Sequence, residues 1–115
     1  MTTAKVYIVD RIVTRPGRAR EFVDRYLAEY VPGAIERGMT LAQVLVAPPL
    51  WLDDRSNTVT VTWELDGPTG WWEMTWKGRP DPEPGRWWAG IEPLISRRTR
   101  ESAAAAGDLA ALSDV

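Results

Sequence analysis

The chain contains no cysteine and no histidine among its 115 residues. Without cysteine it can form no disulfide, no iron–sulfur cluster and no thiolate nucleophile. Without histidine it lacks the commonest general base near neutral pH, and the usual ligand of catalytic zinc and of most haem proteins. Asp, Glu, Tyr, Lys and Arg remain as chemical groups, and they form no tight acidic cluster suited to Mg²⁺. We therefore expect no metal and no tightly bound cofactor.

Long hydrophobic runs and a strong charge of one sign are also absent. The first residues lead directly into a strand-like segment, without the apolar stretch of a signal peptide or a membrane-spanning helix. The formal net charge of −2 gives no reason to expect nucleic acid or an anionic membrane as a partner. The length allows one domain. We expect a cytoplasmic protein that binds neither nucleic acid nor membranes.

Tryptophan, in contrast, is abundant: the chain has seven, and five of them fall between residues 71 and 88. A small domain needs one or two indoles to fill its core, so this number indicates rings that line a cavity or an interface. A flat aromatic pocket of this kind would suit a planar or polycyclic ligand. The alternative is that the rings only fill the core and a dimer interface. The candidate substrate-binding residues are Tyr26, Tyr30, Trp63, Trp72, Trp76 and Trp88.

Hydrophobic periodicity and turn residues divide the chain into alternating strands and helices. Pro32 lies inside the first helix, so this helix should kink there or restart with Pro32 in its first turn. The order strand, helix, strand, strand, helix, strand is the ferredoxin-like βαββαβ plan, an α+β fold with a four-stranded antiparallel sheet and helices on one face. We expect strands at 5–14, 40–47, 58–65 and 91–99, helices at 18–37 and 70–78, and a helical turn at 86–89.

The domain is expected to span residues 1–100, and the Ala-rich residues 101–115 are expected to be a tail or a short helix capped by Ser102. The first strand is largely apolar on both of its faces, which indicates that both faces are covered. Helices cover one face of such a sheet. The simplest cover for the other is a second copy of the chain, sheet against sheet, around a two-fold axis.

Four segments resemble the dimeric α+β barrel superfamily. These are RPGRAREFVDRY at the start of the first helix, VPGAIERGM at its end, NTVTVTWEL in the third strand and PLISRR in the last strand. The superfamily includes small cofactor-independent monooxygenases, EthD-like proteins and NIPSNAP-like proteins. The resemblance covers about Lys5 to Arg100 and implies the same fold and a homodimer. Relatives that bind haem mostly use a histidine, which this chain lacks.

Two carboxylates are candidate catalytic residues. Glu64 ends the third strand on its polar face, which in a dimer would look into the space between the sheets, where a carboxylate can act as a general base. Alternatively, Glu64 pairs with an arginine at the barrel rim. Asp10 interrupts an apolar strand and needs a cationic partner such as Arg97 or Arg98. That pair would be either a cationic clamp for an anionic substrate or an interchain salt bridge.

The sequence leaves the function open between three hypotheses. The first is a cofactor-free homodimeric enzyme that acts on an aromatic or polycyclic metabolite by oxygenation, cyclisation or proton transfer, with Glu64 as the base. The second is a non-catalytic protein that binds a small hydrophobic or aromatic molecule. The third is a structural dimer whose core is filled by the rings.

Overall fold

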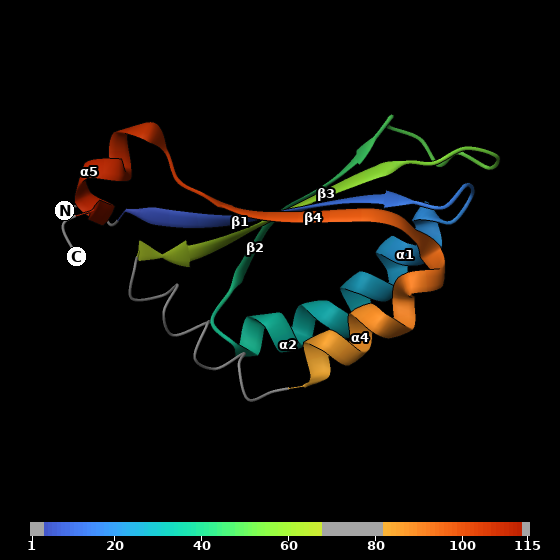
Figure 1. Ribbon diagram of the computed structural model, residues 1–115, viewed down its shortest axis with the longest axis horizontal. Coiled ribbons are helices and arrows are strands. Elements are labelled where there is room, and N and C mark those ends of the chain that lie inside the picture. The colour runs from blue at the N-terminus through green and yellow to red at the C-terminus, as the bar shows by residue number, and fades with distance from the viewer. Residues whose placement is uncertain (1–3, 68–81, 114–115) are drawn as a thin grey trace.

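The computed structural model describes residues 4–67 and 82–113, and Figure 1 shows their arrangement. One antiparallel sheet forms one layer, and the helices α1, α2 and α4 lie together on one of its sides (Figure 1). The elements are β1 (Lys5–Thr14), α1 (Ala19–Arg25), the π-helical segment η1 (Tyr26–Tyr30), α2 (Val31–Glu36), β2 (Thr40–Ala47), β3 (Thr58–Asp66), α4 (Glu83–Ile91), the 3₁₀ turn η2 (Glu92–Leu94), β4 (Ile95–Ala103), the 3₁₀ turn η3 (Ala106–Asp108) and α5 (Leu109–Ser113).

The sheet has four strands in the order β2-β3-β1-β4, which is the expected ferredoxin-like arrangement. Strand β1 lies in the centre and pairs antiparallel with both β3 and β4. The alternation in β3 sets the two faces of the sheet, because neighbouring side chains of a strand point to opposite sides. Val59, Val61, Trp63 and Leu65 are buried under the helices, while Thr58, Thr60, Thr62 and Glu64 point to the helix-free face.

The first helical segment continues past Pro32 by means of a wider turn. The Val31 N–H donates to the carbonyl of Tyr26, five residues earlier, which is the π-helical spacing. Pro32 then lies in the first turn of α2, a position that suits its fixed φ and tolerates its missing N–H. The predicted restart at Pro32 is therefore confirmed. Leu27 and Ile35, two apolar residues of this helical segment, are exposed at 43% and 54%.

The last strand differs from the prediction. It begins at Ile95, not Ile91, because α4 runs as far as Ile91 and Pro93 lies in the following 3₁₀ turn. Proline cannot donate to a strand ladder, so the chain enters the sheet only after it. The strand continues to Ala103, so Ser102 is a strand residue and not a helix cap. The helix predicted at 70–78 lies outside the described residues.

The core lies between the sheet and the helices, and it is built from the inward residues of β1 and β3 and the buried faces of α1, η1 and α2. The described residues provide no such cover for the helix-free face of the sheet. Tyr7, Val9 and Val13 of β1 are only partly buried there, and Leu45 of β2 is 52% exposed. Within the described ranges, no helix has the length and apolar character needed to cross a membrane.

Candidate functional site

Aromatic side chains from three elements meet between the sheet and the helices. Tyr26 and Tyr30 of η1 stack with ring centroids 5.0 Å apart, and Trp87 and Trp88 of α4 meet edge to face at 4.9 Å. Trp87 lies 5.2 Å and Trp88 5.4 Å from the Tyr30 ring. Trp63 of β3 is fully buried behind Tyr26. We call these five residues, Tyr26, Tyr30, Trp63, Trp87 and Trp88, the ring cluster.

Four members of the ring cluster were proposed from the sequence as substrate-binding residues: Tyr26, Tyr30, Trp63 and Trp88. Tyr26 and Tyr30 lie four residues apart at the two ends of η1, a spacing that places both side chains on one side of the helical segment. The structure therefore brings four of the six proposed binding residues together. Trp72 and Trp76, the other two, lie outside the described residues.

Sequence reasoning missed Trp87. It treated residues 86–89 as a single helical turn, whereas α4 has nine residues and presents both Trp87 and Trp88 to the ring cluster. The Trp87 indole N–H donates to Glu29 at 2.9 Å. A signal was present in the sequence: Pro84 fits the first turn of a helix, and Trp87, Trp88 and Ile91 have helical spacing.

The inner part of the ring cluster is a hydrogen-bonded pair. The indole N–H of Trp63 donates to the Tyr26 hydroxyl oxygen at 2.8 Å, and both side chains are almost fully buried. Burial raises the pKa of Tyr26, and the hydrogen bond from Trp63 offsets only part of that shift. Tyr26 is therefore a neutral phenol across the physiological pH range, and not a base.

Asp10 of β1 lies on the helix-covered face, fully buried, and is held by one arginine of β4. Arg100 donates from Nε and Nη2 to the two carboxylate oxygens at 2.7 and 2.9 Å. Arg100 also donates to the Tyr30 hydroxyl at 3.2 Å. Burial lowers the pKa of Arg100, but the hydrogen bond and the charge of Asp10 outweigh burial and leave that pKa raised.

This pair corrects two expectations. The partner of Asp10 is Arg100 and not Arg97 or Arg98, and the ion pair lies within one chain instead of between chains. The reason is the register of the sheet, in which Asp10 lies directly opposite Arg100. A bidentate, buried carboxylate of this kind has both oxygens engaged, so it is positioned to hold Arg100 and Tyr30 in place.

Arg98 lies two residues before Arg100 on the same face of β4 and has a different environment. Its guanidinium carbon is 3.6 Å from the centroid of the Trp88 ring, which is a close cation–π contact. Its Nε is buried and has no hydrogen-bond partner in the part of the chain that the structure describes. Burial lowers the pKa of Arg98, and the nearby Arg100 charge lowers it further against the opposing effect of Asp10.

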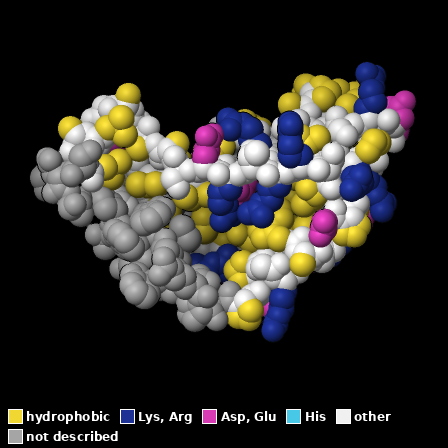
Figure 2. All heavy atoms as spheres, viewed as in Figure 1, with side chains coloured by type: hydrophobic (Ala, Val, Ile, Leu, Met, Phe, Trp, Pro, Cys, Tyr) yellow, Lys and Arg dark blue, Asp and Glu magenta, His cyan; other side chains and the backbone are white. Residues whose placement is uncertain are grey.

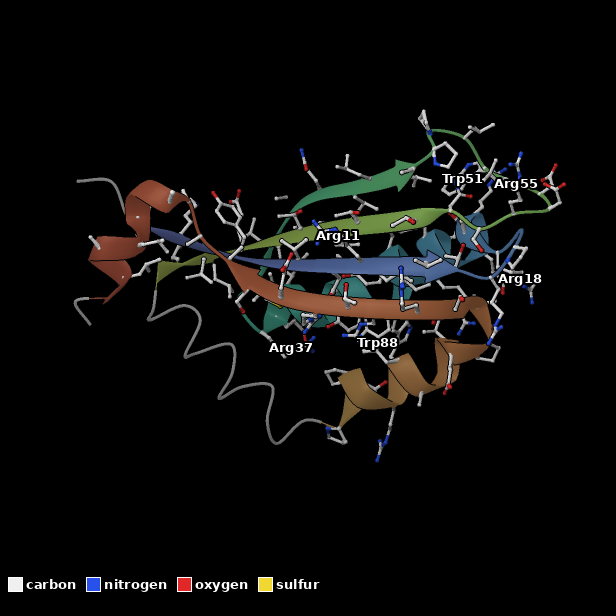
Figure 3. The ribbon with its side chains drawn as sticks, turned by 45° about the horizontal axis from the view of Figure 1, so that its top comes forward. Arg11, Arg18, Arg37, Trp51, Arg55 and Trp88 are labelled. Atoms are coloured by element: carbon white, nitrogen blue, oxygen red, sulfur yellow. The ribbon has the colours of Figure 1, made fainter. Side chains whose placement is uncertain are left out.

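A third arginine, Arg37 at the end of α2, approaches the Tyr30 ring at 5.7 Å. Figure 2 shows basic side chains gathered directly below β4, with hydrophobic side chains around them, where the surface is hollowed between the strand and the helices. Figure 3 places Arg37 and Trp88 on this same side of β4. We call this place, formed by the ring cluster with Arg37, Arg98 and Arg100, the β4–α4 recess.

Glu64 does not belong to the recess. It points to the helix-free face, whereas its neighbour Trp63 is buried on the opposite face. The Lys5 ammonium group lies 3.5 Å from the Glu64 carboxylate, so the partner is a lysine and not the expected rim arginine. This carboxylate raises the pKa of Lys5. Glu64 can therefore meet a ligand only on the helix-free side of the sheet.

Trp51 lies apart from the other described tryptophans, in the segment between β2 and β3 (Figure 3). It is 41% exposed. With Val46, Pro49 and Leu50 it lines a shallow depression of about 310 Å³. The described residues that line this depression are all apolar, which makes it chemically simpler than the β4–α4 recess.

No protein-family model and no curated protein matches the sequence.

Solved structures do match the fold. A NIPSNAP family protein of unknown function from Agrobacterium tumefaciens has a TM-score of 0.68 at 10% identity, over 91% of each chain. An uncharacterized NIPSNAP domain protein from Burkholderia xenovorans has a TM-score of 0.66 at 17% identity, over 88% of this chain and 94% of that one. A second Agrobacterium tumefaciens NIPSNAP family protein has a TM-score of 0.69 at 13% identity, over 91% of this chain and 89% of that one. The chain therefore shares the α+β fold of NIPSNAP proteins, as its sequence resemblance implied.

Proposed function

We propose that the protein is a homodimer that binds a planar aromatic small molecule in the β4–α4 recess. The observation that carries this proposal is the ring cluster, in which Trp87 and Trp88 are only partly buried. Figure 2 shows the surface hollowed between β4 and the helices, on the side of β4 where Figure 3 places Trp88. Trp63 shows how completely an indole is buried when it only fills the core of this protein, and Trp87 and Trp88 are less buried than that. Partly exposed rings in a hollow offer a flat apolar wall for a planar ligand.

Binding fits this site better than catalysis does. Asp10, one of the two candidate catalytic carboxylates, has both oxygens engaged by Arg100. Tyr26 is a buried phenol whose pKa is raised, so it cannot supply a base near neutral pH. The carboxylate of Glu64 lies on the other face of the sheet.

A cofactor-free enzyme is the second candidate, and the partly buried position of Glu64 on the helix-free face favours it. In a sheet-to-sheet dimer this face becomes enclosed, and Glu64 would act there as a general base beside Thr60 and Thr62. Mass spectrometry of a bound aromatic compound after incubation separates the two candidates. Conversion that is lost in Glu64→Gln supports the enzyme, and an unchanged compound supports the binding protein.

The homodimer is proposed from the helix-free face. Tyr7, Val9 and Val13 put apolar surface on that side of the central strand, and Leu45 adds more from β2. Burial of such surface is favourable by about 25 cal/mol per Å². A second copy packed sheet to sheet offers the same apolar side chains in return, because a two-fold interface is self-complementary.

The binding proposal is tested with a neutral compound, 2-naphthalenemethanol, by isothermal titration calorimetry. Trp88→Ala should weaken its binding by about fivefold or more, because aromatic pairs contribute about 0.5–1.5 kcal/mol beyond their buried area. Trp51→Ala removes an indole outside the recess and is the matched control, with unchanged affinity expected. Equal affinities for the two variants and the unaltered protein would place the ligand elsewhere and reject the recess.

A further inference from the structure

Among the described residues, the β4–α4 recess has more positive than negative charges. Arg37, Arg98 and Arg100 bring three positive charges to the ring cluster, and Asp10 neutralises only Arg100. Glu29 accepts from Trp87, but it is exposed and forms its ion pair with Arg25 on the same helical segment. Among the described residues, Arg98 forms no ion pair with a carboxylate. The described part of the recess therefore has an excess of positive charge beside its aromatic wall.

The stacking of Arg98 on Trp88 does not use the N–H donors of the guanidinium. A guanidinium that stacks on an indole uses its flat face, and its N–H groups point outward in the plane of the group. The contact of Arg98 with Trp88 at 3.6 Å is of this kind. A planar fork of N–H donors matches the two oxygens of a carboxylate, and such charge-assisted pairs are the stronger hydrogen bonds of proteins.

Arg100, the next arginine on the same face of β4, already forms a pair of this kind with a carboxylate. Arg100 holds Asp10 with two donors at 2.7 and 2.9 Å. Arg98 lies one step along the same face of β4, opposite Ile12, where β1 supplies an apolar side chain and no carboxylate. Among the described residues the buried Nε of Arg98 has no partner, which is unfavourable, so an anion at the Arg98 guanidinium would supply an acceptor that Ile12 lacks.

We propose that the ligand of the recess is an aromatic carboxylate, whose carboxylate group pairs with the Arg98 guanidinium while its ring lies against the ring cluster. This proposal rests on the aromatic site proposed above and adds the charge of the ligand. Trp88 links the two halves of the site, because it touches Arg98 on one side and belongs to the ring cluster on the other. Arg37 adds a long-range attraction for the same negative charge.

The test compares three compounds with the same ring system: 2-naphthoate, 2-naphthalenemethanol and 2-naphthylmethylammonium. In calorimetric titrations of the unaltered protein, 2-naphthoate should bind about tenfold or more tightly than the neutral alcohol, because hydrogen bonds between charged groups exceed neutral ones. The ammonium compound should bind most weakly. Rising salt concentration should weaken the binding of 2-naphthoate and leave that of the alcohol nearly unchanged.

Two variants of adjacent residues identify the arginine responsible. Arg98→Gln should remove the advantage of 2-naphthoate over 2-naphthalenemethanol. Arg97→Gln removes the same charge from the helix-free face of the same strand, since Arg97 is exposed and lies opposite Val13, and should preserve the advantage. Thermal unfolding of both variants checks that they fold.

The outcomes separate this proposal from the one it rests on. Equal affinity for the three compounds, unchanged in Arg98→Gln, would overturn the carboxylate proposal and leave the aromatic site standing. Loss of the 2-naphthoate advantage in Arg97→Gln instead of Arg98→Gln would also overturn it. Failure of all three compounds to bind would overturn both proposals.

Discussion

At the scale of single residues, two ion pairs on strands β1 and β4 have nearly the same length and very different surroundings. Arg100 meets the fully buried Asp10 at 2.7 Å, and Arg11 meets Glu101 at 2.8 Å on the opposite face, where both side chains are more than half exposed. Water screens the second pair and cannot reach the carboxylate of the first. The two pairs therefore provide an internal comparison of what burial does to an ion pair.

We predict that Asp10→Asn lowers the free energy of unfolding by about 2–3 kcal/mol, because it leaves the partly buried Arg100 without its counter-ion. Glu101→Gln, the matched control, should change it by less than about 1 kcal/mol. Denaturant unfolding monitored by tryptophan fluorescence measures both. Similar losses in the two variants would contradict the view that burial makes the difference.

Tyr26 predicts a dependence of stability on alkaline pH. Because burial raises its pKa, the folded protein retains the phenolic proton to a higher pH than the unfolded chain does. Its contribution to stability is complete below the ordinary tyrosine pKa of about 10 and is lost as the pH rises from there toward the raised value. Tyr26→Phe should be less stable at neutral pH, because the Trp63 N–H loses its acceptor, but should lose stability less steeply above about pH 10. If the free energies of unfolding of the two proteins fall in parallel above about pH 10, Tyr26 is not the group responsible.

At the scale of elements, the turn that leads from β1 into α1 depends on a glycine. Gly17 has a φ of +74°, and a Cβ added there would lie 2.5 Å from the backbone oxygen of Asp53 in the connection between β2 and β3. The Gly17 N–H also donates to the Arg55 carbonyl of that connection at 3.2 Å. The turn therefore fixes the β2–β3 connection against the start of the first helix.

We predict that Gly17→Ala destabilises the protein by about 1–3 kcal/mol, through both backbone strain and this close contact. Gly90→Ala is the contrasting variant, because Gly90 lies within α4 and an added Cβ meets nothing within 4 Å. That change should stabilise the protein by about 0.5–1 kcal/mol by the helix preference for alanine. Thermal unfolding of the two variants should therefore shift in opposite directions, and shifts of the same sign would contradict this explanation.

The elements predicted correctly from the sequence are those that are determined by residues close together along the chain. Strand β1 has the predicted bounds, and the alternation of β3 correctly placed Trp63 on the face opposite Glu64. The start of β4 and the length of α4 were wrong, because each depends on where a proline-containing turn ends. The partner of Asp10 was missed for a different reason: the choice between Arg97, Arg98 and Arg100 is set by the pairing of strands that lie far apart in the sequence.

At the scale of the whole molecule, the sheet separates two surfaces with different chemistry. The helix-covered side carries the ring cluster and the arginines of the β4–α4 recess (Figure 2). The helix-free side carries Glu64 and the partly buried apolar residues of β1. A sheet-to-sheet dimer would cover the second surface and leave the first accessible, so dimerisation and ligand binding would use opposite faces.

Because the two surfaces are separate, we predict that a substitution can abolish dimerisation without abolishing ligand binding. Val9→Lys places a charge near the middle of the helix-free face, where two copies would bring like charges together and bury them, so the variant should be monomeric. Ala28→Lys adds the same charge on the exposed side of the first helical segment and should leave the dimer intact.

Sedimentation equilibrium at micromolar concentration distinguishes the two variants, and calorimetry shows whether each still binds 2-naphthalenemethanol. We expect the Val9→Lys monomer to retain binding, because every described contact of the recess lies within one chain. A monomeric unaltered protein would refute the dimer. A Val9→Lys monomer that no longer binds would show that the second copy completes the site, and the enclosed face with Glu64 would then become the stronger candidate for the ligand.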